Sequence, residues 1–197
     1  MKNVLLILLL SICFCTFKSS AQTKTIDRIK YRITSKEYQT VEVTKTKIEG
    51  HVTIPSTITI DNKEYTVTRI GDSAFDGGKY SWLGLIGITI PNSIVTIGRY
   101  AFRNAFNSNE TLSPVIIPTS VIIIEAHAFE RCMAPIIVPN SVTKIEEKAF
   151  DSCDRVSYEL PNWNDANILS SALLTHLGDK VRYEFPNWRV SITFPSA

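Results

Sequence analysis

The chain has 197 residues, of which 44% are hydrophobic and 20% charged, and this length suits one domain of ordinary size. Its formal net charge is +2, from 21 basic and 19 acidic residues. Such a balance excludes the strongly basic surface that binds nucleic acid or an anionic membrane.

The N-terminal segment has the layout of an export signal. A positively charged start is followed by an apolar run from Val4 to Phe17 and by a small-residue tail that ends at Ala21. The run is shorter than the roughly 20 residues that a membrane-spanning helix needs. Residues 1–21 are therefore predicted to be a secretory signal peptide cleaved after Ala21, with no transmembrane segment in the mature chain.

A lipoprotein signal is the alternative for the same segment. It requires Cys13 or Cys15 as the acylated residue, but each follows a bulky residue where a small one is expected. Cleavage after Ala21 is therefore favoured, and the protein is expected to be secreted or to lie at the cell surface. The cleaved segment contains Lys2, Lys18 and no acid, so 19 basic and 19 acidic residues remain and the mature net charge is zero.

Residues 22–50 are expected to form an N-terminal cap. The stretch from 26 to 50 alternates apolar and polar residues, which predicts two strands. A cap is needed here because the open end of a repeat array exposes its core and a strand edge.

From residue 51 the chain repeats a short extended motif that ends in proline. The copies are HVTIP at 51–55, GITIP at 87–91, VIIP at 115–118, IIVP at 136–139 and YELP at 158–161. In three copies an aliphatic residue lies three positions after the proline, isoleucine lies six positions after it, and an Ala-Phe pair ends eleven positions after it. The repeat array is predicted to span residues 51–163.

Phenylalanine occupies the same place in four units, at Phe75, Phe102, Phe129 and Phe150. The spacings are 27, 27 and 21 residues, which are typical of solenoids whose units bury their apolar side by stacking. The four rings are therefore predicted to form a buried ladder. The first unit also carries an insertion around Asp61-Asn62-Lys63, which predicts a small hairpin.

Each unit is predicted to form one coil of an α+β repeat solenoid. The I-x-I segment is extended, and proline ends it because proline lacks a ladder donor. The residues around Ala-Phe are expected to form a short helical turn that points the ring into the core.

Cysteine appears in one slot of the repeat, three residues after the phenylalanine. Cys132 and Cys153 share this slot with Gly78 and Ala105, so the slot accepts small residues. Stacked buried thiols are favoured over a disulfide, although export and the spacing of neighbouring coils permit the bond.

The units NSIVTIGRYAF, TSVIIIEAHAF and NSVTKIEEKAF resemble the BspA-like leucine-rich repeat family, as does the opening HVTIPSTITIDNKEYTVTRIGDSAF. The resemblance covers residues 38–161. It implies a leucine-rich-repeat-like stack of coils in an exported protein. Several members of the family are implicated in adhesion to host proteins or other cells, and the family has no enzyme signature.

Residues 164–197 are expected to form a C-terminal cap of a helix plus strands. ANILSSALLTHLGD replaces the Ala-Phe turn and has the apolar spacing of a helical face that ends at Gly178. The flanking YELPNW at 158–163 recurs as YEFPNW at 183–188, a period of 25 residues. A candidate aromatic surface for glycans would use Tyr80, Trp82, Trp163 and Trp188, although packing of the cap is the favoured role for the last two.

The middle residue of each I-x-I-P segment should face away from the core. These residues are Thr53, Thr89, Ile116, Ile137 and Glu159. Two neighbouring isoleucines are unexpected on a soluble surface, and Ile122 and Ile123 add apolar surface on the same coil. The four isoleucines are covered by another part of the protein or an oligomer contact, or they form a protein-binding patch.

No catalytic or cofactor site is predicted. His51, His127 and His176 have no metal-ligand spacing, and neither Ser73 nor Ser152 has a base partner in phase with it. The chain is predicted to be a non-catalytic exported repeat protein that binds a host or cell-surface protein, with adhesion or host interaction at the bacterial surface as its expected role. A carbohydrate-binding module and a self-associating structural protein are the alternatives.

Overall fold

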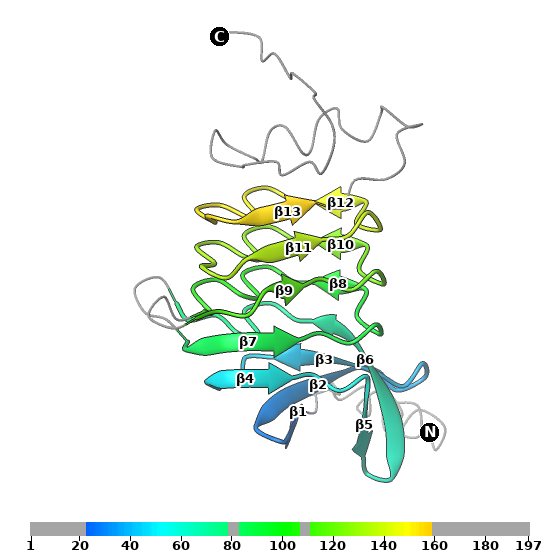
Figure 1. The fold of residues 1–197 in the computed structure, drawn as a ribbon. Helices are drawn as coiled ribbons and strands as arrows, with labels where there is room; N and C mark the ends of the chain where they lie inside the picture. The colour runs from blue at the N-terminus through cyan, green and yellow to red at the C-terminus, as the bar shows by residue number, and fades with distance from the viewer. Residues whose placement is uncertain (1–22, 79–82, 107–110, 159–197) are drawn as a thin grey trace, which may run out of the picture.

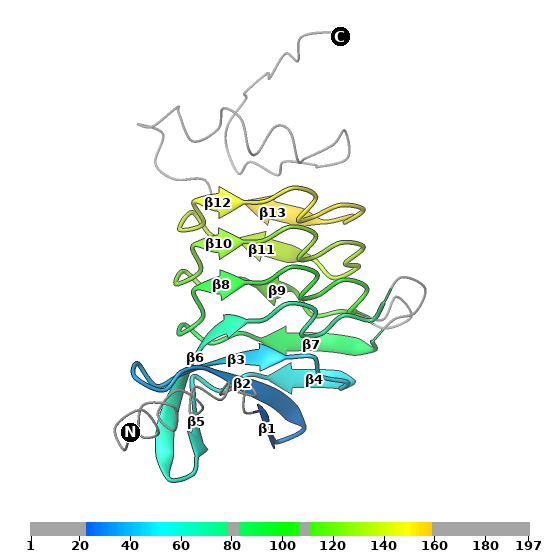
Figure 2. The same cartoon turned by 180° about the vertical axis from the view of Figure 1, so that it is seen from behind.

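The computed structural model describes residues 23–78, 83–106 and 111–158. Within them the chain winds into stacked coils, and each coil places one short strand on either side of the stack (Figure 1). Figure 2 shows the same stack from behind, with β8, β10 and β12 in front.

One side of the stack is a parallel ladder of strands. It contains β6 (Lys63–Ile70), β8 (Thr96–Ile97), β10 (Ile123–Ile124) and β12 (Lys144–Ile145). The register places Ile70, Ile97, Ile124 and Ile145 above one another. Repetition of isoleucine in this slot therefore builds one continuous wall of the core.

The other side of the stack consists of two separate parallel sheets. The first pairs β4 (Gly50–Thr53) with β7 (Leu85–Thr89), and the second contains β9 (Val115–Ile116), β11 (Ile136–Val138) and β13 (Val156–Tyr158). β7 and β9 are in contact but belong to different sheets. This break between β7 and β9 is the place of the hollow described below.

An N-terminal group of strands covers the first coil. β1 (Thr23–Ile26), β2 (Ile29–Ser35) and β3 (Thr40–Thr44) pair antiparallel, and β3 then pairs parallel with β6. The two strands predicted over residues 26–50 correspond to β2 and β3, with β1 as a third. The inserted hairpin consists of β5 (Thr57–Ile60) and β6, joined by Asp61-Asn62.

The described residues contain no helix, so the helical turn that we predicted around each Ala-Phe pair is corrected to a tight turn. In a helix the Phe102 N–H would bond the carbonyl of Gly98; instead it donates to Ala128 in the next coil at 2.7 Å. The Ala101 N–H donates to Gly98 at 3.2 Å. Alternate N–H groups thus serve the turn and the neighbouring coil.

Left-handed residues enforce this turn. Two residues before each phenylalanine the backbone has positive φ, at Ser73, Tyr100, His127 and Lys148. Left-handed conformations also follow the ring at Asn104, Arg131 and Ser152. A right-handed helix cannot pass through such positions.

Within the described ranges, no helix offers the length and hydropathy that crossing a bilayer requires. The C-terminal helix expected within 164–197 lies outside these ranges.

The rings of Phe75, Phe102, Phe129 and Phe150 stack along the axis of the solenoid. Successive centroids are 5.3, 5.1 and 5.4 Å apart, with interplanar angles of 6°, 16° and 10°. Phe75, Phe102 and Phe129 are fully buried. Offset stacking at these distances adds to the gain from burying the rings.

The last described coil has a different register from the one that its proline predicts. Ile137 pairs with Ser157, and Val138 pairs with Tyr158. Alignment on Pro161 predicts that Glu159 lies beside Ile137, and this prediction is wrong by two residues. Ser157 therefore continues the outward row.

Truncation of a central ring tests the stack. Phe102→Ala should lower the free energy of unfolding by about 3–5 kcal/mol, because it removes a ring that packs on both sides and leaves a cavity. Tyr38→Ala is the control, since Tyr38 is 76% exposed; its effect should stay below about 0.5 kcal/mol. Urea denaturation followed by circular dichroism measures both variants, and equal effects would contradict the stacked core.

Candidate protein-binding surface

We call the side of the stack with β6, β8, β10 and β12 the first side, and the side with β4, β7, β9, β11 and β13 the second side. The outward residues of the second side form a row across the coils. Ile116 is 62% exposed and pairs in register with Ile137, which is partly buried. The residues beside them on β9 and β11 are buried, at Val115, Ile136 and Val138. The alternation of a strand therefore fixes both isoleucines on the solvent side of the sheet.

A shallow hollow of about 360 Å³ lies beside Ile116, where β7 and β9 are not joined in one sheet. Its wall combines apolar atoms with hydroxyl, amide and imidazole groups, contributed by Ile116, Pro118, Thr53, Thr89, Asn92, Ser113 and His51. The His51 ring lies against Gly87, where an added Cβ would be 2.8 Å from Nδ1. A side chain at position 87 would therefore displace His51 from the hollow.

The other predicted apolar residues lie on a different sheet. Ile122 is 38% exposed and precedes β10, and Ile123 is the first residue of β10 and partly buried. The structure thus does not join them with Ile116 and Ile137 in one patch. It adds Val95, which is 43% exposed and accepts a 2.9 Å hydrogen bond from the Ile122 N–H. Sequence analysis missed Val95, although it lies two residues before Ile97 as Ile122 does before Ile124.

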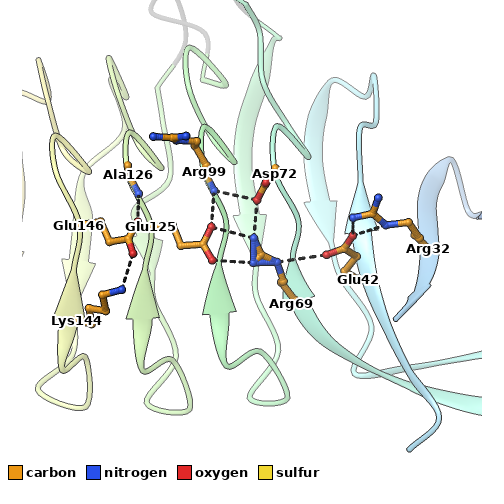
Figure 3. A network of polar contacts seen from close by, with 9 residues as sticks. All are labelled: Arg32, Glu42, Arg69, Asp72, Arg99, Glu125, Ala126, Lys144 and Glu146. Atoms are coloured by element: carbon orange, nitrogen blue, oxygen red, sulfur yellow. Dashed lines mark hydrogen bonds and ion pairs between the residues drawn. The ribbon is translucent and has the colours of Figure 1, made fainter. Parts of the chain in front are cut away.

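A polar network crosses the first side of the stack (Figure 3). Arg69 is its centre: Nη1 and Nη2 each donate to Glu125 at 2.9 Å, and Nε donates to Glu42 at 3.3 Å. Nη2 also bonds Asp72. The Glu42 carboxylate is only 4% exposed and has Arg32 on its other side. A buried carboxylate between two guanidinium groups avoids the cost of an unpaired charge.

Two glycines make room for this network. Arg69 and Glu125 belong to coils that are not neighbours, and Gly98 lies between them in the ladder. A Cβ at Gly98 would lie 2.7 Å from Asp72 Oδ1 and 2.8 Å from Arg69 Nη2. At Gly71 a Cβ would lie 2.6 Å from the carbonyl oxygen of Val43. The ion pair therefore depends on the absence of these side chains.

The network continues into the last described coils. Glu146 accepts a hydrogen bond from Lys144 Nζ at 2.6 Å and from the Ala126 N–H at 3.2 Å. The bond from Lys144 is the main reason that the pKa of Glu146 is lowered. Each of the four carboxylates in Figure 3 thus has a cationic partner.

Gly98→Ala tests the passage of the ion pair. The added methyl group should displace Arg69 and Asp72 and lower the free energy of unfolding by about 1–3 kcal/mol. Thr96→Ala, two residues earlier on β8, is the control and should cost less than about 1 kcal/mol. Guanidinium adds salt, so urea denaturation is the suitable measurement. A Gly98→Ala protein as stable as the wild type would contradict the steric role of Gly98.

Cys132 and Cys153 are free buried thiols in the same slot of neighbouring coils. Cys153 Sγ donates to the carbonyl of Phe129 at 3.0 Å. Burial raises the pKa of Cys132 well above its usual value and that of Cys153 to about 12. Because only the thiolate is reactive and burial disfavours it, we interpret the two cysteines as small packing residues of the core.

The cysteines are expected to resist alkylation. At pH 8 iodoacetamide should label neither thiol of folded residues 22–197 and both after denaturation. Because the pKa of Cys153 is higher in the folded protein than its unfolded value of about 8.5, folding favours the neutral thiol. Its contribution to the free energy of unfolding is complete below about pH 8.5 and is lost as the pH rises towards 12. Mass spectrometry gives the number of labels. Labelling of the folded protein, or a mass lower by two hydrogens, would contradict buried free thiols.

The candidate aromatic surface lies outside the described residues, because none of Tyr80, Trp82, Trp163 and Trp188 falls within them. Inside them, His127 stacks on Tyr100 with centroids 4.8 Å apart, and its Nδ1 is 2.9 Å from Glu130 Oε2. No group of three or more His, Cys, Asp or Glu side chains in the described part is arranged to hold a metal ion.

The repeat pattern and the stacked coils agree with a known family. The sequence profile of the BspA type leucine rich repeat region matches residues 51–107 and 103–177, in six copies. The chain belongs to the BspA-type leucine-rich repeat family. The resemblance seen in the sequence is thus confirmed, and so is the repeat fold of stacked strands.

Solved structures of leucine-rich repeat proteins have the same fold. One from Bacteroides ovatus is 31% identical, with 70% of this chain and 35% of that protein covered and a TM-score of 0.56. One from Bacteroides capillosus is 28% identical, with 70% and 99% covered and a TM-score of 0.55. A protein from T. pallidum shows the fold at 23% identity and a TM-score of 0.50, with 71% and 72% covered.

The matched region equals about a third of the Bacteroides ovatus protein and nearly all of the Bacteroides capillosus protein. No curated protein matches the chain. This BspA-type protein therefore shares its family and fold with these proteins, and its ligand has to be inferred from its own surface residues.

Proposed function

We propose that this BspA-type protein is an exported, non-catalytic binding module that recognises a host or cell-surface protein through the face around Ile116 and Ile137. Adhesion at the bacterial surface is the biological role that this activity would serve. The proposal depends on one observation above the others, which is the 62% exposure of Ile116 on the outward row.

The chemistry of the row favours a protein partner. Thr53, Thr89 and Ser157 occupy the same outward position in other coils, so the repeat itself does not require isoleucine there. An exposed isoleucine costs solubility, and such residues cluster at protein-binding sites. The adjoining hollow offers a place for a partner side chain, together with hydroxyl and amide groups that would orient it.

Export is supported by the sequence and is compatible with the family. The segment 1–21 has the layout of a cleaved signal, and the mature net charge of zero does not favour attraction to an anionic surface. A partner would therefore be selected by shape and apolar contact more than by charge.

Substitution of both isoleucines tests the proposal. Ile116→Lys/Ile137→Lys should weaken binding at least about 30-fold, since loss of a central apolar anchor commonly costs about 2 kcal/mol or more. Residues 22–197 would be applied to arrayed extracellular-matrix proteins and glycans, and surface plasmon resonance would quantify each protein hit.

Val95→Lys/Ile122→Lys is the matched control, because it places the same charges on exposed apolar positions of the other side. Circular dichroism must show that both variants are folded. Equal losses in the two variants, or full binding by Ile116→Lys/Ile137→Lys, would contradict the assigned face. Glycan binding that survives both changes would instead favour the carbohydrate alternative and the candidate aromatic surface of Tyr80, Trp82, Trp163 and Trp188.

A further inference from the structure

Two hairpins near the N-terminus are copies of one pattern. Residues 23–31 read TKTIDRIKY, and residues 57–65 read TITIDNKEY. The first contains β1 and the start of β2, and the second contains β5 and the start of β6. Each turn has two successive residues at positive φ, with Asp27 at 47°, Arg28 at 67°, Asp61 at 49° and Asn62 at 61°. This is the two-residue hairpin turn that best matches the twist of the strands.

The two hairpins flank β3, with β2 antiparallel and β6 parallel to it. β2 pairs with β3 on one side and β6 pairs with it on the other, so β1 and β5 become the two outer strands of this group. The tyrosines of the shared pattern, Tyr31 and Tyr65, are both buried. Among the described residues no strand pairs with the outer edge of either β1 or β5 (Figure 1).

The backbone of β5 offers hydrogen-bonding groups along that edge. The Thr66 N–H donates to the carbonyl of Gln39, the residue just before β3, at 2.8 Å, so it points away from Thr57, its partner in the hairpin. Thr57 and Thr66 therefore form a pair without mutual hydrogen bonds, and the alternation of an antiparallel ladder turns the N–H and C=O of Thr57 and Thr59 outward. Both threonines are exposed.

The two edges differ at one decisive position. Lys24 pairs with Tyr31 in the first hairpin, and Ile58 pairs with Tyr65 in the second. Because paired residues lie on one face of a sheet, Lys24 shares a face with Tyr31, and Ile58 shares a face with Tyr65. Lys24 and Ile58 therefore have equivalent positions in the two hairpins. A lysine on an edge strand is a common defence against pairing with another chain. β5 has no charge: its four residues are all Thr or Ile, which favour strands most strongly.

We propose that the outer edge of β5 pairs antiparallel with β5 of a second copy of this chain. The two-fold axis passes between Ile58 and Ile58 of the partner subunit. Thr57 then exchanges both backbone hydrogen bonds with Thr59 of the partner subunit, and the symmetry repeats this on the other side of the axis. The same operation on β1 would set Lys24, which forms a 3.4 Å ion pair with Asp61, opposite Lys24 of the partner subunit, and like charges opposite each other are unfavourable. Self-complementarity thus selects β5 and a second copy as its occupant.

A four-residue edge forms a small contact, so the dimer should be weak. We expect a dissociation constant between about 10 μM and 1 mM, as for contacts below the standard interface size. Sedimentation equilibrium of residues 22–197 over that range should show a reversible monomer–dimer equilibrium. This inference is independent of the partner proposed for the Ile116 face, because the two surfaces lie on different elements.

Proline at Thr59 is the decisive variant. Thr59→Pro removes an outward N–H that β6 does not use, and edge strands accept proline at such positions. Loss of two of the four intermolecular bonds should raise the dissociation constant at least about tenfold. Thr25→Pro is the matched control, because Thr25 has the same position relative to its own turn on β1. It should leave the dimer unchanged.

A cross-link provides a readout that does not depend on proline. Ile58→Cys should give a disulfide-linked dimer under mild oxidation, since residues facing each other without mutual hydrogen bonds bring their side chains closest. Lys24→Cys should not. A strictly monomeric wild type, equal effects of Thr59→Pro and Thr25→Pro, or cross-linking through Lys24→Cys alone would each overturn the proposal. Binding of a synthetic peptide of residues 56–61 by a protein that never dimerises would assign the edge to a different partner and would also overturn it.

Discussion

The rest of the structure depends on how backbone N–H groups alternate around each phenylalanine. One group closes the turn on its own coil, and the next reaches a carbonyl of the following coil, as the bonds from Ala101 and Phe102 show. This arrangement satisfies the backbone without a helix and holds each coil in fixed register on its neighbour. A residue type in one slot therefore becomes a row along the stack.

Each row has its own chemistry, and different rows serve the core, the ion pairs and the candidate binding surface. Inside, stacked phenylalanines and isoleucines provide the apolar burial on which solenoid stability depends. On one outer side, the rows around Arg69 hold charges that neutralise one another. On the other side, the row through Ile116 has no charge at Thr89, Ile116 or Ile137. That contrast supports the assignment of recognition to the second side.

Residues at a fixed position in every repeat could be predicted from the sequence, and places where a coil departs from the repeat could not. Four regularly spaced phenylalanines predicted the repeat, and alternation about the proline placed Ile116 outward, because both follow from local periodicity. Ser157 replaced Glu159 because paired strands, and not the proline, set the register of β13. The predicted helical turn failed because its N–H groups bond a neighbouring coil. The contact between Arg69 and Glu125 joins residues 56 positions apart, a separation that no periodicity reveals.

The gap left by Gly98 changes how the solenoid should come apart. A stack in which each coil touches only the next behaves as a one-dimensional chain and frays from its ends. Here the guanidinium of Arg69 passes the intervening coil and is bound by Glu125 from the coil beyond. Three coils are thereby linked as one block, so opening of the third also releases a charge on the first. Cooperativity in this region therefore extends beyond nearest neighbours, through the missing side chain of a single glycine.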